Sequence, residues 1–87
     1  MKQPPEWIEK AKETYRFHRS KLLSNSSWRT KDTAKVLRRA VGSVSEDLLI
    51  ARWLKTHETQ IEKFEYIYEA LEFIREKKEE QKLRELD

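Results

Sequence analysis

The chain has 87 residues, enough for one small domain but too few for two independent hydrophobic cores. Hydrophobic residues make up 37% and charged residues 40%, so a minimal core must lie beneath a densely charged surface. The lack of cysteine excludes disulfides and thiolate chemistry, and no stretch approaches the roughly 18 apolar residues of a membrane-spanning helix. With one glycine and two prolines, the sequence predicts a single all-α domain of four helices, and we expect it in the cytoplasm.

Charge is distributed unevenly along the chain. Residues 1–55 hold 13 lysines and arginines against 6 acidic residues, a balance of +7. Residues 56–87 hold 6 against 10, a balance of −4, which gives +3 in total. A basic front half suits contact with nucleic-acid phosphates, whereas a solvated charge dipole without a binding role is the alternative.

Apolar side chains recur every three or four residues after Pro4 and Pro5, which predicts an amphipathic first helix. The stripe consists of Trp7, Ile8, Ala11, Tyr15, His18 and Leu22. Because His18 lies on this stripe, we expect a packed, hydrogen-bonded core residue rather than a metal ligand or a catalytic base. For the basic residues on the other face, a solvated surface and phosphate contact both stay open.

Residues 23–27 predict a loop, because Leu23 is followed by four small polar side chains that compete for backbone hydrogen bonds. Trp28 is expected to pack this loop against the core. Thr30 is a suitable N-cap for a second helix, and Asp32 suits the positive end of the helix dipole.

Residues 30–55 show the spacing of two helices joined by a tight turn. Ala34 and Leu37 share one face of the first helix, and Val44 and Leu48 share one face of the second. The small side chain of Ala34 leaves space where two steeply crossing helices meet.

The start of the second helix in this segment has two possible positions. It begins either after Ala40 or three residues later, where residues 43–46 form a capping box. Farther along, six of the seven residues over 48–54 are apolar, so this helix is predicted to be the central element of the domain.

The residues Ala34, Leu37, Val44 and Leu48, with a small residue at Ala40, resemble the DNA-binding helix-turn-helix of ParB/KorB-type partition proteins and short phage-encoded relatives. The resemblance covers the middle third of the chain and, weakly, residues 64–74. It implies a phage- or plasmid-type protein that binds double-stranded DNA. Arg38 stands where the turn often has Gly or Asn, and Ala40 where Ser or Thr is usual. Only about 29 residues precede this region, too few for the nucleotide-binding domain of those proteins, so CTP chemistry is not carried over.

In such a motif, the first turns of the second helix meet base edges in the major groove. The predicted base-reading residues are Val41, Gly42, Ser43, Ser45 and Glu46, and the predicted phosphate contacts are Arg29, Lys31, Arg38 and Arg39. Gly42 allows close approach, and Glu46 can accept a hydrogen bond from a cytosine amino group. For Arg38 and Arg39, an ordinary exposed turn is the alternative. Because Glu46 and Asp47 repel phosphate, we expect tight binding to need a dimer or a partner.

Residues 55–59 predict a connector, and residues 59–62 a capping box that opens a C-terminal helix over about 60–86. The apolar stripe of this helix consists of Ile61, Phe64, Ile67, Leu71 and Ile74. Tyr66 and Phe73 fall beside the stripe, which predicts an interface with a protein partner or a second copy. The charged segment after Ile74 is expected to be a solvated helical end, with docking of Leu83 and Leu86 on a neighbour as the alternative.

Catalytic patterns do not assemble in this sequence. His18 and His57 lack the cysteines or the HExxH spacing of a zinc site, and there is no glycine-rich phosphate loop. We therefore expect no enzymatic activity, no metal and no cofactor. The main prediction is a DNA-binding regulator or DNA-organising protein. The alternative is a helical protein-interaction module, such as a phage factor or an assembly adaptor.

Overall fold

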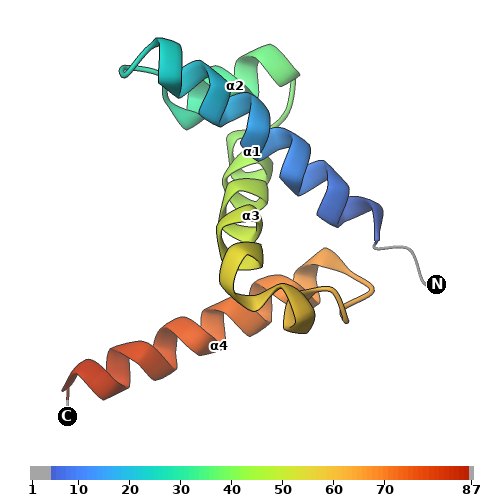
Figure 1. The fold of residues 1–87 in the computed structure, drawn as a ribbon, viewed down its shortest axis with the longest axis vertical. Helices are drawn as coiled ribbons and strands as arrows, with labels where there is room; N and C mark the ends of the chain where they lie inside the picture. Colours follow the sequence, from blue (N-terminus) through green and yellow to red (C-terminus); the bar gives the residue numbers. More distant parts are fainter. Residues whose placement is uncertain (1–4, 87) are drawn as a thin grey trace.

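The computed structural model describes residues 5–86, and these residues form four helices with no strand among them (Figure 1). Helix α1 spans Glu6–Ser24, α2 spans Thr30–Leu37, α3 spans Val41–Ile61 and α4 spans Ile67–Leu86. The predicted all-α class with four helices is confirmed. Pro5 is the N-cap of α1, as its lack of a backbone N–H favours, whereas Pro4 lies outside the described residues.

The other three helices all pack against α3. Helix α1 crosses over it, α2 lies against its N-terminal half, and α4 crosses it near its C-terminal end (Figure 1). The apolar run in the middle of α3 explains this arrangement. Ile50, Ala51 and Leu54 are buried on one face, and Leu49 and Trp53, on other sides of the helix, also pack against the core. The prediction that this helix is central is confirmed.

Two hydrophobic clusters lie along α3. In the smaller one, Ala34 of α2 meets Val44 and Leu48 of α3, and Tyr15 of α1 packs against them. Ala34 is only 3% exposed, in keeping with its predicted place where two helix backbones approach closely. The larger cluster joins α1, α3 and α4, and its buried members are Ile8, Ala11, Ile50, Leu54, Ile61, Ala70 and Ile74.

The boundaries between α1 and α2 differ from those predicted. Helix α1 continues into the predicted loop and ends at Ser24, whose hydroxyl donates back to the carbonyl of Lys21 at 3.2 Å. The N-cap of α2 is Arg29 rather than Thr30. Its backbone N–H donates to the carboxylate of Asp32 at 2.9 Å, so this first-turn acid caps the helix by reaching back.

The predicted connector over residues 55–59 is wrong, because α3 continues to Ile61 with a kink at His57 (φ −130°, ψ 31°). The His57 ring packs 4.7 Å from that of Trp53, one turn earlier, and 6.2 Å from that of Phe73 in α4. These aromatic contacts hold the polar segment against α4 in helical form.

The C-terminal helix begins at Ile67 rather than near residue 60, so the predicted capping box over 59–62 does not open it. The chain turns over residues 62–66, and the Tyr66 N–H donates to the Glu69 carboxylate at 3.1 Å. The reversal between α3 and α4 therefore lies farther along the chain than the sequence indicated.

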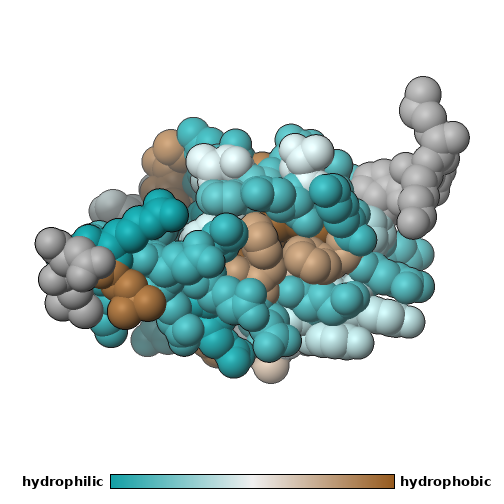
Figure 2. Space-filling model, turned by 90° about the horizontal axis from the view of Figure 1, so that it is seen from below, coloured by the Kyte–Doolittle hydropathy of each residue, from teal (hydrophilic) through white to brown (hydrophobic). Residues whose placement is uncertain are grey.

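Helix α4 packs on the body of the protein through its first half. Ala70 and Ile74 are buried, whereas residues 78–85 are all exposed, and the helix extends away from α1 and α2 (Figure 1). Seen from below, the molecule is largely hydrophilic, with a hydrophobic area in the middle ringed by hydrophilic side chains (Figure 2). In the described part of the chain, no helix is long and apolar enough to cross a membrane.

Candidate nucleic-acid interface

Helices α2 and α3 are joined by the turn Arg38 to Ala40, and Arg38 is the residue at which the chain changes direction. Its backbone is left-handed (φ 55°, ψ 48°), a conformation that side chains other than glycine adopt at a cost. The N–H of Arg39 donates to the Ala34 carbonyl at 2.9 Å and closes the end of α2. Arg38 thus holds a strained conformation that glycine would adopt without cost.

Helix α3 begins at Val41, the earlier of the two predicted starts. Its N-cap is Ala40, whose carbonyl accepts from the Val44 N–H at 3.1 Å, and the capping box over residues 43–46 is not the helix start. The predicted base-reading residues Val41, Gly42, Ser43, Ser45 and Glu46 are all exposed, whereas Val44, Asp47 and Leu48 between and after them are buried. The structure therefore gathers these five residues on the open side of the first turns of α3.

Gly42 is not required by the fold. A Cβ atom built on it meets nothing within 4 Å, and its φ is not positive. Glycine also weakens a helix relative to alanine. What glycine provides at this position is an uncovered backbone that an external molecule can approach.

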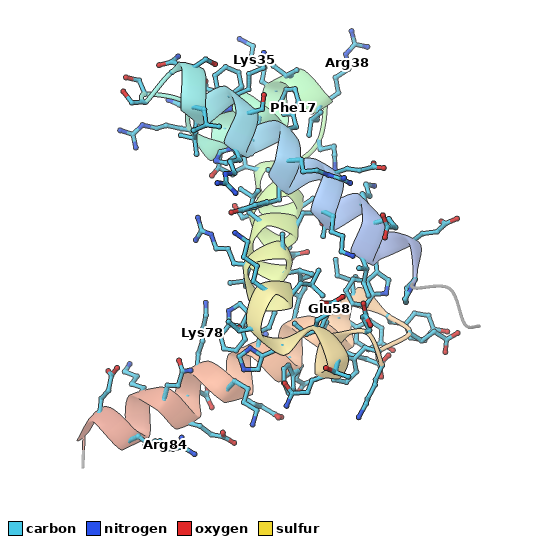
Figure 3. The ribbon with its side chains drawn as sticks, in the orientation of Figure 1. Phe17, Lys35, Arg38, Glu58, Lys78 and Arg84 are labelled. Carbon is cyan, nitrogen blue, oxygen red and sulfur yellow. The ribbon has the colours of Figure 1, made fainter. Side chains whose placement is uncertain are left out.

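Exposed basic side chains flank this surface. Arg29 precedes α2, and Lys31, Lys35 and Arg38 follow at intervals that place them on one side of it. Figure 3 shows Lys35 and Arg38 at the same end of the molecule, pointing away from its body. Lys35 is absent from the predicted phosphate contacts, although its spacing of four from Lys31 carries the same signal.

Arg39 has a different role from the one predicted. Its Nη1 lies 2.6 Å from Oδ2 of Asp47 and donates to the Thr14 hydroxyl at 3.0 Å. A carboxylate as buried as that of Asp47, only 2% exposed, needs a compensating cation. Arg39 is thus neither an open phosphate clamp nor an ordinary exposed turn residue, because its guanidinium ties the turn to α1 and α3.

The ion pair also changes the charge balance of the proposed DNA-facing end. From the sequence, Glu46 and Asp47 are both predicted to repel phosphate. Because Asp47 is buried and paired, Glu46 is the one exposed acid on the first turns of α3. Thr14, which the sequence analysis missed, donates to Asp47 at 3.0 Å; its position three residues after Ala11 places it on the inner face of α1.

His18 is a packed and hydrogen-bonded core residue, as predicted. It is 8% exposed, and its Nδ1 lies 2.7 Å from the hydroxyl of Thr33. The same hydroxyl accepts from the indole N–H of Trp28 at 2.7 Å, so Thr33 links Trp28 to His18. Burial, and then the positive charge of Arg52, lower the pKa of His18. The three side chains fix the loop and the start of α2 to α1.

The structure separates the two residues predicted as a partner interface. Phe73 packs 5.7 Å from Phe64, ring centre to ring centre, and belongs to the larger hydrophobic cluster. Tyr66 is 51% exposed and stacks on Tyr68, which is 64% exposed, with ring centres 5.5 Å apart and planes 7° apart. Core packing accounts for Phe73, whereas the stacked tyrosine pair is largely open to solvent.

Among the described residues, no group of three or more His, Cys, Asp or Glu side chains is arranged to hold a metal ion. Searches with protein-family models, curated proteins and solved structures found no match to this chain.

Proposed function

We propose that this chain binds double-stranded DNA with α2 and α3 acting as a helix-turn-helix, in a regulatory or DNA-organising role within the cytoplasm. The observation that supports this most is the contrast along α3. Its first turns present Val41, Gly42, Ser43, Ser45 and Glu46 to solvent, whereas its middle is buried. Reading the major groove requires a helix that is free at its N-terminal turns and anchored beyond them.

The strained backbone at Arg38 supports the same function. A left-handed conformation costs a residue other than glycine about 1–2 kcal/mol. Glycine would relieve this strain, yet the position carries a long cation that points away from the body (Figure 3). A phosphate contact gives a reason for placing an arginine at this position.

The charges around α3 are compatible with a DNA backbone. Lys31, Lys35 and Arg38 provide an exposed basic edge, and the negative charge of Asp47 is neutralised internally by Arg39. Glu46 remains as the exposed acid and is the group that can accept from a cytosine amino group. Under this proposal, phosphate contacts supply the affinity and the exposed turns of α3 supply the sequence preference.

The test is fluorescence anisotropy of labelled duplex DNA titrated with protein at several salt concentrations. Lys35→Ala combined with Arg38→Gly removes two cations without straining the turn. If both contact phosphate, the slope of log affinity against log salt falls by about 2. Lys78→Ala combined with Arg84→Ala is the matched control, because these cations lie on the extended part of α4 (Figure 3). No binding at low salt, or an equal loss in the control, would refute the proposal.

A helical protein-interaction module is the second candidate function, and the exposed Tyr66–Tyr68 stack favours it. Tyr66→Ala with Tyr68→Ala is the variant that separates the two candidates, because it leaves every residue of α2 and of the first turns of α3 in place. Capture of a defined partner that this double variant loses, in the absence of any DNA binding, would favour the interaction module instead.

A further inference from the structure

A groove of about 310 Å³ opens between α1 and α3, away from the first turns of α3. Its lining includes the apolar residues Ala51 and Leu54 of α3 and the ring of Tyr15 of α1, together with three cations, Lys12, Arg16 and Lys55, and one acid, Glu58. A lining of apolar groups and cations is suited to a flat hydrophobic group that brings negative charge with it.

The positive charge of this groove is organised around Tyr15. The Nζ of Lys55 donates to the Tyr15 hydroxyl at 2.7 Å and lies 4.6 Å from the centre of the ring. This hydrogen bond, together with the charges of Lys55, Arg19 and Arg52, lowers the pKa of Tyr15 against the opposing effect of its burial. Cations from two helices therefore converge on one side of the groove.

A surface of complementary character lies where α3 ends and α4 begins. We call it the tyrosine patch, and it consists of the stacked, exposed rings of Tyr66 and Tyr68 with the exposed Glu62, Glu65 and Glu72. Residues 56–74 hold five glutamates and one lysine, so the surroundings of the rings are acidic. The Glu65 carbonyl accepts from the indole N–H of Trp7 at 2.9 Å, which fixes this turn to the start of α1.

We propose that the groove of one copy receives the tyrosine patch of a second copy, forming a dimer. The two tyrosine rings meet the apolar lining of the groove, and Glu62 and Glu65 meet its cations. Glu58 lines the groove and precedes Glu62 by four residues, so the two surfaces adjoin. Neighbouring complementary surfaces allow a two-fold arrangement, in which the same contact forms twice and the assembly closes. This inference goes beyond DNA binding, because neither surface includes α2 or the first turns of α3.

The experiment is sedimentation velocity of the protein alone at low and high salt. The wild-type chain is expected to form dimers at low salt and to dissociate as salt screens the charges. Arg16→Glu reverses a charge on the groove, and Glu65→Lys reverses one on the patch while keeping the backbone bond to Trp7. Each variant alone is expected to lose at least tenfold in dimer affinity.

Mixing the two variants separates this proposal from a folding defect. In the mixture, the acidic groove of one variant faces the basic patch of the other, which is the original pair of charges in swapped positions, and the reverse contact is the unchanged wild-type pair. A heterodimer is therefore expected from two monomeric proteins. Lys78→Glu and Glu79→Lys make the same changes in net charge on the extended part of α4 and serve as controls that stay dimeric.

Four outcomes would overturn the proposal: a wild-type chain that stays monomeric at low salt, single variants that dimerise normally, a mixture that stays monomeric, or open-ended growth. If the wild-type chain is monomeric and Arg16→Glu weakens DNA binding, the groove binds the DNA backbone instead of a second copy. If the wild-type chain is monomeric and an added acidic peptide binds in the groove, the groove binds another protein instead of a second copy. The Lys35→Ala, Arg38→Gly variant is expected to dimerise like the wild-type chain while its DNA binding weakens, so failure of DNA binding and failure of dimerisation are distinguishable.

Discussion

The guanidinium of Arg39 and the carboxylate of Asp47 lie 2.6 Å apart in a place where the carboxylate side chain is only 3% exposed. The pair joins the turn before α3 to the inner face of α3, and the Thr14 hydroxyl bonds to both partners. The orientation of the turn, and with it that of the exposed face of α3, thus depends on one buried charge and its compensation.

Removing either partner of this pair is expected to destabilise the protein by about 3 kcal/mol, because the remaining group is left without compensation. The variants are Arg39→Met and Asp47→Leu, and the measurement is the free energy of unfolding in urea, followed by circular dichroism. The double variant is expected to lose less than the sum of the single losses. Strictly additive losses would show that the two groups are not coupled.

Arg38→Gly is expected to stabilise the fold by about 1 kcal/mol, because glycine adopts the left-handed conformation without strain. The same change is expected to weaken DNA binding, since the cation is lost. Thermal unfolding and anisotropy on the same samples measure the two effects. Arg38→Ala keeps the strain and is the comparison, with lower stability than Arg38→Gly. Destabilisation by Arg38→Gly would contradict the assignment of strain to this turn.

Gly42→Ala is expected to raise stability by up to about 1 kcal/mol, because alanine is the better helix former and its Cβ meets no neighbour. DNA affinity is expected to fall, since the added methyl group would stand between the backbone of α3 and the major groove of the DNA. The free energy of unfolding and the DNA affinity, measured on the same variant, check that stability rises while affinity falls. An affinity that stays unchanged would remove Gly42 from the proposed contact surface.

Thr33→Val replaces a fully buried hydroxyl with a methyl group of similar size. The indole N–H of Trp28 and the Nδ1 of His18 then lose their shared partner, at an expected cost of about 2 kcal/mol. Denaturant unfolding measures the loss, with Thr30→Val at the first position of α2 as a control. Equal effects at both positions would mean that the cost comes from the valine in a helix and not from the hydrogen bonds.

Stability is expected to fall as the pH drops below about 6.5, because the pKa of His18 is lower in the folded chain than its ordinary value of 6.5. The unfolded chain binds the proton more readily in this range, so the contribution is fully present above pH 6.5 and declines below it. Comparison of unfolding free energies at about pH 5.5 and about pH 7.5 tests this. His18→Gln is expected to reduce the difference; an unchanged difference would exclude His18 as its source.

Local spacing was sufficient for the helices and for the contact of Ala34 with Val44 and Leu48, because those residues follow the period of a helix. It also placed His18 on the inner face of α1. These features depend on neighbours within one or two turns, or on a pair of helices joined by a short turn, and so can be inferred from sequence.

The remaining features depend on partners that lie far apart in the chain. Asp47 is only eight residues from Arg39, but the Thr14 hydroxyl that contacts both side chains is 33 residues from Asp47, so the buried site that pairs the two charges is not visible in the local sequence. The segment 55–59 has no apolar residue that marks it as part of a helix. Packing of His57 between Trp53 and Phe73 holds this segment of α3 against α4. The stack of Tyr66 on Tyr68 likewise depends on the turn before α4, which the sequence analysis placed too early.

Because α3 passes through both hydrophobic clusters, neither cluster belongs to a separable folding unit. The smaller one, around Ala34 and Val44, and the larger one, which includes Ile50 and Leu54, share this helix. We therefore expect loss of packing at Ile74 in α4 to lower the population of molecules in which α2 and the start of α3 are ordered. In thermodynamic terms, the outward-facing end at Gly42 is expected to be coupled to α4 through α3.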